Sequence, residues 1–184
     1  MSIENFNLSE SELVNHCIRH ERRYQEILYR QYADEMYSVA LIYSDNDQDA
    51  CDIVQESFIK VFKKLESFKF ECALKAWIRK VVVNTALDHF RKRKREMENA
   101  QHYIQTVDVE VDEILPSINA AELLAMMQRL PQKAAMVLKL FAIEGYGHKE
   151  IAEMLQITEG TSKSQLNRAR FLLKTIISEF NAVT

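Results

Sequence analysis

The scarcity of glycine and proline constrains this 184-residue chain most strongly, since it contains only 3 Gly and 2 Pro. Tight hairpin turns depend on these residues, whereas the many Leu, Ala, Glu, Lys, Arg and Gln residues favour helices. Apolar residues recur at helical spacing, and 47% hydrophobic content is enough to bury one ordinary core or two small ones. The sequence therefore predicts an all-α protein.

Apolar residues never form a membrane-length run, and the amino terminus MSIENFNLSESE is acidic without a signal-peptide core. We therefore expect a cytoplasmic protein with no membrane insertion. The 3 Cys are widely spaced and form no C-x-x-C pair, which argues against disulfides and cysteine zinc sites. His16 and His20 have a spacing that could hold a metal, but no further ligands are evident, so a polar helix face is favoured. No metal and no cofactor are expected.

The net charge of −3 hides a strong segregation of charge along the chain. Residues 75–95 carry eight basic side chains and one acidic one, whereas residues 96–128 carry seven acidic side chains and no Lys or Arg. Residues 129–174 are basic again, with eight bases against four acids. This pattern indicates two separate nucleic-acid contacts, joined by an acidic segment that avoids phosphates.

The first half of the chain shows three apolar stripes at helical spacing, with SDND at 44–47 as a turn and SFKFECA at 67–73 as a connector. Helices are expected over 24–43, over 48–65 and from residue 74 to the run RKRKR, with a leading helix within 8–17. The stripes are Leu28, Tyr32, Met36, Val39, Ala40 and Tyr43, then Ala50, Val54, Phe58, Val61, Phe62 and Leu65, then Leu74, Trp77, Ile78, Val81 and Val82.

The second half begins where helical periodicity fades, in the acidic stretch TVDVEVDEILP. Helices follow over about 118–129, 132–143, 148–155 and 159–178, and their tight breaks suit a helix-turn-helix. The predicted organisation is a helical domain over 1–96, an acidic linker over 97–117 and a helix-turn-helix domain over 118–184.

The segment TEGTSKSQLNRARFLL, residues 158–173, has two different faces when it is read as a helix. Ser162, Leu166 and Ala169 fall on one face with Leu173 and Ile176, and polar and basic residues fall opposite. Thr158 can cap this helix and leave first-turn amides free for a phosphate. A plain helical hairpin with a solvated face is the alternative, but the bases and hydroxyls favour DNA.

The segment LPQKAAMVLKLFAIEGYGHKEIAEMLQITEGTSKSQLNRARFLL resembles the carboxy-terminal promoter-binding domain of extracytoplasmic-function (ECF) sigma factors. It departs from that pattern at Gly147, where Ser usually caps, at Ser162, where a buried Val is common, and at Gln165, which replaces a frequent Arg. The resemblance implies contacts to the minus-35 element from a set of polar side chains. These are Lys163, Ser164, Asn167 and Arg168 in the major groove and Thr161 near the backbone.

The segment DACDIVQESFIKVFKKL resembles the part of the same family that docks on the clamp of the largest subunits of core RNA polymerase. The resemblance makes Asp52, Gln55 and Glu56 candidate polymerase contacts. Taken alone, a charged helix face of this kind is ordinarily only solvated.

The segment FECALKAWIRKVVVNTALDHFRKRKRE resembles the family's reader of the minus-10 element. Opening a promoter requires pockets for unstacked bases and cations along the backbone, and Asn84 can bond a base edge. Trp77 lies in the apolar stripe and is expected in the core. The candidates for the minus-10 element and the melted strand are Phe68, Phe70, Asn84, Asp88, Arg91, Lys92, Arg93, Lys94 and Arg95.

The resemblance implies an ECF-type sigma factor, which binds core polymerase, recognises the minus-35 element as duplex and helps to melt the minus-10 element, giving single strands. It performs no chemistry itself and is not an enzyme, and an anti-sigma factor is an expected partner. A stand-alone helix-turn-helix regulator, acting as a dimer, would leave residues 48–95 unexplained. An enzyme or metal protein would need a catalytic cluster, and the sequence has no glycine-rich phosphate loop or nucleophile elbow.

Overall fold

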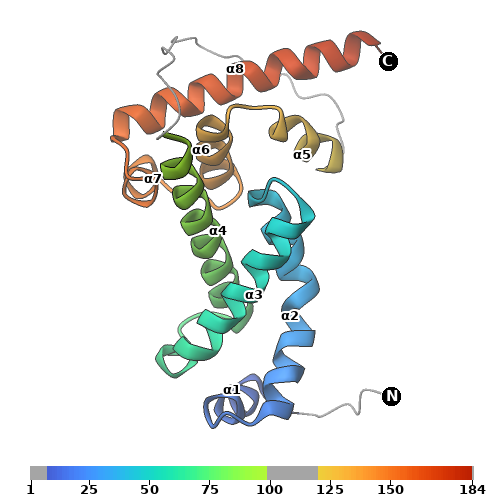
Figure 1. Ribbon diagram of the computed structural model, residues 1–184, viewed down its shortest axis with the longest axis vertical. Helices are drawn as coiled ribbons and strands as arrows, with labels where there is room; N and C mark the ends of the chain where they lie inside the picture. Colours follow the sequence, from blue (N-terminus) through green and yellow to red (C-terminus); the bar gives the residue numbers. More distant parts are fainter. Residues whose placement is uncertain (1–7, 99–119, 184) are drawn as a thin grey trace. The chain divides into compact units, whose positions relative to one another are not determined.

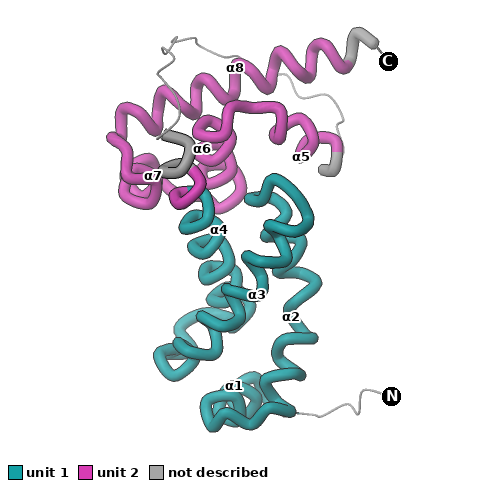
Figure 2. The backbone as a smooth tube through the Cα atoms, in the orientation of Figure 1, with its two compact units in different colours: residues 1–90 teal, residues 91–184 magenta. Residues whose placement is uncertain are grey.

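The structure of the protein is a computed structural model that describes residues 8–98 and 120–183. Every regular element in these two ranges is a helix, which confirms the predicted fold class. The chain forms two compact units, residues 1–90 and residues 91–184, coloured separately in Figure 2. The predicted domain boundaries stay predictions, because most of the proposed 97–117 linker lies outside the described residues.

Unit 1 is built from α1, α2, α3, a short 3-10 turn η1 and most of α4 (Figure 1). Their bounds are α1 Glu10–Ile18, α2 Arg22–Tyr43, α3 Asp47–Lys64, η1 Leu65–Ser67 and α4 Leu74–Glu98. Asn46 begins α3 as its N-cap, because its side-chain oxygen accepts a hydrogen bond from the Asp49 amide at 2.9 Å.

The core of unit 1 follows the predicted stripes closely in α2 and less closely in α3. All six stripe residues of α2 are buried, and Leu28 and Met36 have no exposed surface. In α3 the buried face also takes in Ile53 and Ser57, whereas Phe62 is only half-buried. The buried face of α3 is therefore rotated slightly about the helix axis relative to the predicted apolar stripe.

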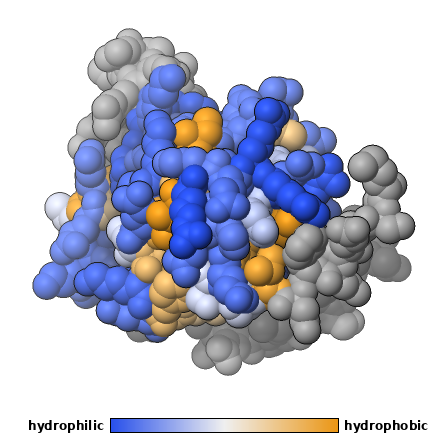
Figure 3. All heavy atoms as spheres, turned by 90° about the horizontal axis from the view of Figure 1, so that it is seen from below, coloured by the Kyte–Doolittle hydropathy of each residue, from blue (hydrophilic) through white to orange (hydrophobic). Residues whose placement is uncertain are grey.

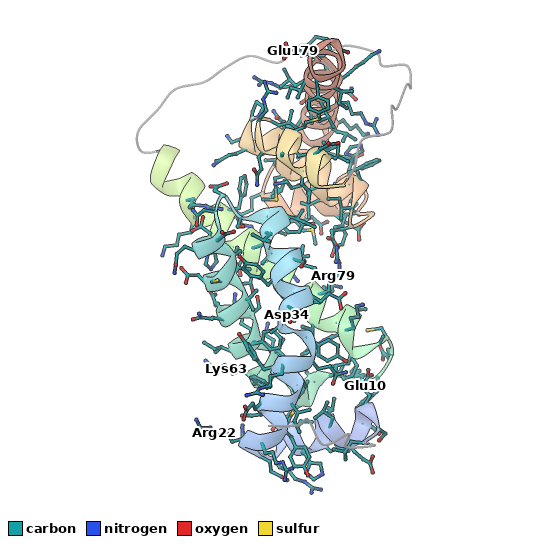
Figure 4. All side chains as sticks on the ribbon, turned by 90° about the vertical axis from the view of Figure 1, so that its right-hand side faces the viewer. Glu10, Arg22, Asp34, Lys63, Arg79 and Glu179 are labelled. Atoms are coloured by element: carbon teal, nitrogen blue, oxygen red, sulfur yellow. The ribbon has the colours of Figure 1, made fainter. Side chains whose placement is uncertain are left out.

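The start of α4 is anchored by a contact from the beginning of the chain. The Leu74 amide donates a hydrogen bond to Glu10 Oε1 at 3.3 Å, so an α1 side chain caps α4; Glu10 is labelled in Figure 4. Leu74, Ile78 and Val82 are buried as predicted. Trp77 was expected in the core but is only half-buried.

Beyond the end of α4, the described residues of unit 2 form α5 Ala120–Gln128, α6 Gln132–Ala142, α7 His148–Leu155 and α8 Glu159–Val183. The bounds of α7 match the prediction, α5 and α6 each end one residue before the predicted 129 and 143, and α8 continues five residues beyond the predicted 178; the predicted start of the first helix at 118 lies outside the described residues. Val137 and Leu140 of α6, Ile151 of α7 and Leu166 and Ala169 of α8 form much of its buried core.

The face drawn in Figure 3 is largely hydrophilic, and its hydrophobic patches are small and separate. No helix in residues 8–98 or 120–183 combines the length and hydropathy needed to span a bilayer. Within the same ranges, no three His, Cys, Asp or Glu side chains are grouped as a metal site would require.

Candidate nucleic-acid and polymerase interfaces

The turn between α7 and α8 has the hydrogen bonds of a compact helix-turn-helix. Gly147 begins α7, and its amide donates to Glu150 Oε2 at 2.8 Å. The helix ends at Leu155. Its C-cap, Gln156, has a φ of 54° in the left-handed region, and the Ile157 amide donates to the Ala152 carbonyl at 3.0 Å. A hydrogen bond of this kind, from an amide after the helix to a carbonyl in its last turn, characterises helices that end in a left-handed residue. Gly is the usual residue at that left-handed position.

Thr158 caps α8 as predicted. Its Oγ1 accepts a hydrogen bond from the Thr161 amide at 3.0 Å and also bonds the Thr161 hydroxyl at 2.8 Å. The cap satisfies one of the four amides that a helix start leaves without intrahelical partners. Glu159 and Gly160, which follow the cap, are both exposed.

The two predicted faces of α8 differ in burial. Ser162, Leu166 and Ala169 are buried, whereas Leu173 and Ile176 are only half-buried. The predicted minus-35 contacts lie outside the buried stripe and are exposed or half-buried: Thr161, Lys163, Ser164, Asn167 and Arg168.

Lys163 already has a partner on its own helix. Its Nζ lies 2.8 Å from Glu159 Oε1, one turn earlier. The hydrogen bond from Lys163 lowers the pKa of Glu159, so this carboxylate is ionised near neutral pH. A negative charge therefore stands in the first turn of the helix that carries the predicted DNA contacts.

Three aromatic rings meet in and beside the connector between α3 and α4. Phe68 is buried, and its ring centroid lies 4.7 Å from Phe70 and 5.4 Å from Trp77. Phe70 is 48% exposed and has a φ of 58°, a left-handed conformation unusual for a bulky residue. The structure thus brings Phe68 and Phe70 into contact, with one ring in the core and the other at the surface.

The predicted minus-10 residues on α4 occupy consecutive turns. Asn84 and Asp88 are both exposed and stand one turn apart. Arg91, Lys92 and Arg93 follow within the same helix; Lys94 and Arg95 also belong to α4, but their side chains lie outside the described residues.

A network of charged groups joins α3 to α4. Lys60 Nζ lies 2.8 Å from Glu56 Oε1 and 3.2 Å from Asp88 Oδ2, and it also donates to Thr85 Oγ1 at 3.3 Å. His89 Nε2 lies 2.7 Å from the second oxygen of Glu56. A hydrogen bond from Lys60 and, to a smaller extent, one from His89 lower the pKa of Glu56. Sequence reasoning missed Lys60, because periodicity identifies a face but not a partner on another helix.

The predicted polymerase contacts on α3 have different surroundings. Asp52 and Gln55 are exposed, whereas both carboxylate oxygens of Glu56 are engaged by Lys60 and His89. One turn after Gln55, Ile59 is 55% exposed. The sequence did contain a signal for Ile59, since it is an apolar residue on the polar side of the predicted helix.

The two histidines that were weighed as metal ligands have different surroundings. His16, on α1, has its Nδ1 2.9 Å from Glu21 Oε1, and its ring stacks on Tyr24 with centroids 4.0 Å apart. His20 is exposed in the turn after α1 and has a φ of 59°. The polar helix face favoured by the sequence therefore holds for His16 but not for His20, which lies beyond the end of the helix.

Comparison with known proteins finds two family matches, one in each unit. Residues 28–96 match Sigma-70 region 2, and residues 120–172 match Sigma-70, region 4. These ranges contain every predicted contact to polymerase and DNA.

Whole-chain relatives agree with these matches. The chain is 30% identical over 139 residues to the ECF RNA polymerase sigma factor EcfG of Rhodopseudomonas palustris, with 75% of this chain and 76% of that protein covered. It is 27% identical over 182 residues to the ECF RNA polymerase sigma-E factor of Haemophilus influenzae, with 92% and 96% covered.

Among solved structures, the sigma factor RpoE from Bartonella quintana, in complex with the anti-sigma factor NepR, has a similar fold. The TM-score is 0.51 at 23% identity, over 83% of this chain and 96% of that one. With a region 2 unit, a region 4 helix-turn-helix and relatives along most of its length, the chain belongs to the ECF-type RNA polymerase sigma factors, non-enzymatic proteins that act in transcription initiation.

Proposed function

We propose that this sigma factor binds core polymerase through the outer face of α3, reads the minus-35 element as duplex through α8, and helps to melt the minus-10 element with α4 and the preceding connector. The observation that carries the proposal is the division of α8 into a buried stripe and a polar face behind a capped, exposed first turn. We also propose that this protein recognises promoters in the cytoplasm.

The minus-35 assignment rests on the chemistry of the polar α8 side chains outside the buried stripe. Asn can bond adenine through two hydrogen bonds, and Arg and Lys bond guanine. Asn167 and Arg168 stand beside each other, and Lys163 stands one turn before Asn167. Thr161, whose amide bonds the Thr158 cap, is proposed to meet a phosphate together with the first-turn amides.

The minus-10 assignment rests on an exposed aromatic ring with buried support. Phe70 offers a stacking surface and packs against Phe68, whose ring in turn packs against Trp77. Stacking of one base on an aromatic side chain contributes about 1–3 kcal/mol, which offsets part of the cost of unstacking that base. Asn84 is exposed on α4 and can bond a base edge.

The polymerase assignment rests on Asp52 and Gln55, which are exposed on α3. Ile59 extends the same side by one turn with an apolar group. We assign Glu56 a supporting part in this surface, because Lys60 and His89 already engage both of its oxygens.

An anti-sigma factor is proposed as a further partner. The Bartonella quintana sigma factor with a similar fold was solved bound to the anti-sigma factor NepR. Co-purification from the native cell tests this partner, and recovery with polymerase alone under all growth conditions would count against it.

The proposal is tested by fluorescence anisotropy with purified core polymerase. Asp52→Asn combined with Gln55→Ala should weaken binding to core enzyme, whereas Lys63→Ala, which also changes an exposed residue of α3, should not. A helix-turn-helix regulator that acts alone would not bind core enzyme at all.

The basic run of α4 has a separate test in the salt dependence of promoter binding. If the five bases from Arg91 to Arg95 each meet a phosphate, they contribute about −4 to the slope of log affinity against log salt. Neutralising all five should flatten the holoenzyme slope by that amount. An unchanged slope would remove these residues from the proposed contact.

A further inference from the structure

We propose that His148 is a positioning residue, which fixes the rotation of α8 about its axis by holding Ser162; the inference rests on the proposed reading of DNA by α8. Ser162 has no exposed surface and stands between Thr161 and Lys163, two of the proposed DNA contacts. His148 Nδ1 lies 3.0 Å from Ser162 Oγ, and the bond joins the first residue of α7 to α8.

A serine hydroxyl is an unusual group to bury between two packed helices. Leaving it without a hydrogen bond in the core would destabilise the fold, so its partner matters. A hydroxyl can donate and accept, and the bond therefore forms with either neutral tautomer of His148 and with the protonated ring. The Val that ECF sigma factors commonly have at this place could not make it.

The imidazole is held from α6 as well. Its ring stacks on Phe141, with centroids 5.0 Å apart and planes 24° apart. The guanidinium of Arg170, from α8, lies 5.5 Å from the Phe141 centroid. These contacts join α6, α7 and α8, so the position of His148 does not depend on its single bond to Ser162.

The bond can control recognition because it is directional. Apolar packing along Leu166 and Ala169 is non-directional and tolerates small rotations of α8. A rotation of about 20° would carry side-chain tips about 6 Å from the helix axis through about 2 Å. That displacement exceeds the tolerance of a hydrogen bond to a base edge. If α8 could rotate freely, it would discriminate less between bases, whereas its attraction to phosphates would remain.

The test uses the full chain with core polymerase and two duplexes of equal length. One is selected from a library randomised in the upstream promoter element, and the other is its scrambled version. His148→Asn keeps an amide near the place of Nδ1, whereas His148→Gln moves the amide to the place of Nε2. Ser162→Ala removes the hydroxyl with a minimal change of volume. Affinities for both duplexes are measured, together with thermal unfolding.

We expect His148→Gln and Ser162→Ala to reduce the preference for the selected duplex by about fivefold or more, the equivalent of one base contact, with affinity for the scrambled duplex unchanged. His148→Asn should keep the wild-type preference for the selected duplex. Unchanged preference, or an equal loss on both duplexes, in Ser162→Ala would overturn the inference.

Asn167→Ala separates this inference from the proposed function. If Asn167→Ala lowers the preference and the His148 and Ser162 variants do not, only the positioning role fails. If Asn167→Ala combined with Arg168→Ala leaves the preference intact, the reading of DNA by α8 fails with it.

Discussion

The cap of the recognition helix offers a perturbation whose effects on stability and on DNA binding can be separated. Thr158 is exposed, and its Oγ1 accepts the Thr161 amide at 3.0 Å. Thr158→Ala therefore removes the cap and the bond to the Thr161 hydroxyl. Losing an N-cap hydroxyl costs about 1 kcal/mol, within a range of about 0.5–2 kcal/mol. For a unit of this size, that loss lowers the melting temperature by about 4–8 °C.

Thr158→Asp keeps a capping oxygen and adds a negative charge. Asp caps at least as well as Thr and interacts favourably with a helix amino terminus, so the variant should be as stable as the wild type. A unit charge about 5 Å from a phosphate in water is repelled by about 0.8 kcal/mol, and the predicted loss of DNA affinity is thus about fourfold at low salt. Thr158→Ser should preserve both properties.

The assay combines thermal unfolding with anisotropy of a labelled duplex bound by holoenzyme. Thr158→Asp should be at least as stable as the wild type, and Thr158→Ala should be less stable. Thr158→Asp should nevertheless bind DNA more weakly than the wild type. Wild-type affinity in Thr158→Asp would refute the placement of phosphate at this helix end. Wild-type stability in Thr158→Ala would refute the assignment of the cap.

Three further predictions concern the same two units. Gln156→Gly should stabilise unit 2 by about 0.5–1 kcal/mol in chemical denaturation, because glycine adopts the left-handed turn conformation without strain. Glu159→Gln should release Lys163 for the major groove and remove a negative charge from the first turn of α8, so holoenzyme should bind the duplex more tightly at low salt; unchanged affinity would contradict the placement of Lys163 at the DNA. The hydrogen bond from Lys60 lowers the pKa of Glu56 below its ordinary value of 4.5. The ionised Glu56 carboxylate therefore stabilises the fold at pH values above 4.5, and this stabilisation is lost as the pH falls through the lowered pKa. Glu56→Gln should therefore be less stable than wild type at pH 7, by about 0.5 kcal/mol given partial exposure, with a difference that disappears in acid melts.

The helices could be predicted because their signal is local. All six buried positions of α2 follow from the spacing of apolar residues alone. The cap at Thr158 and the buried stripe of Ser162, Leu166 and Ala169 follow from residue types at fixed offsets. Trp77 lies in the apolar stripe but is only half-buried, and its ring packs against Phe68 from the connector, a contact that helical spacing could not predict.

The partners of polar side chains could not be predicted, since helical spacing gives a face and not the group that meets it. Lys60 pairs with Asp88 across 28 residues, and Glu10 caps Leu74 across 64. The bond between His148 and Ser162 depends on the tight turn that joins two helices. In the candidate sites, the sequence therefore indicated the residues proposed to meet DNA and missed the groups within the protein that contact them.

The most direct test of the account is to reconstitute this chain with purified core polymerase on a genomic library and to sequence the transcript starts. The account predicts starts confined to sites that share one upstream duplex element and one downstream melted element, with upstream preference altered by changes in α8 and downstream preference altered by changes at Phe70 or Asn84. Starts no more selective than those of core enzyme alone would contradict it.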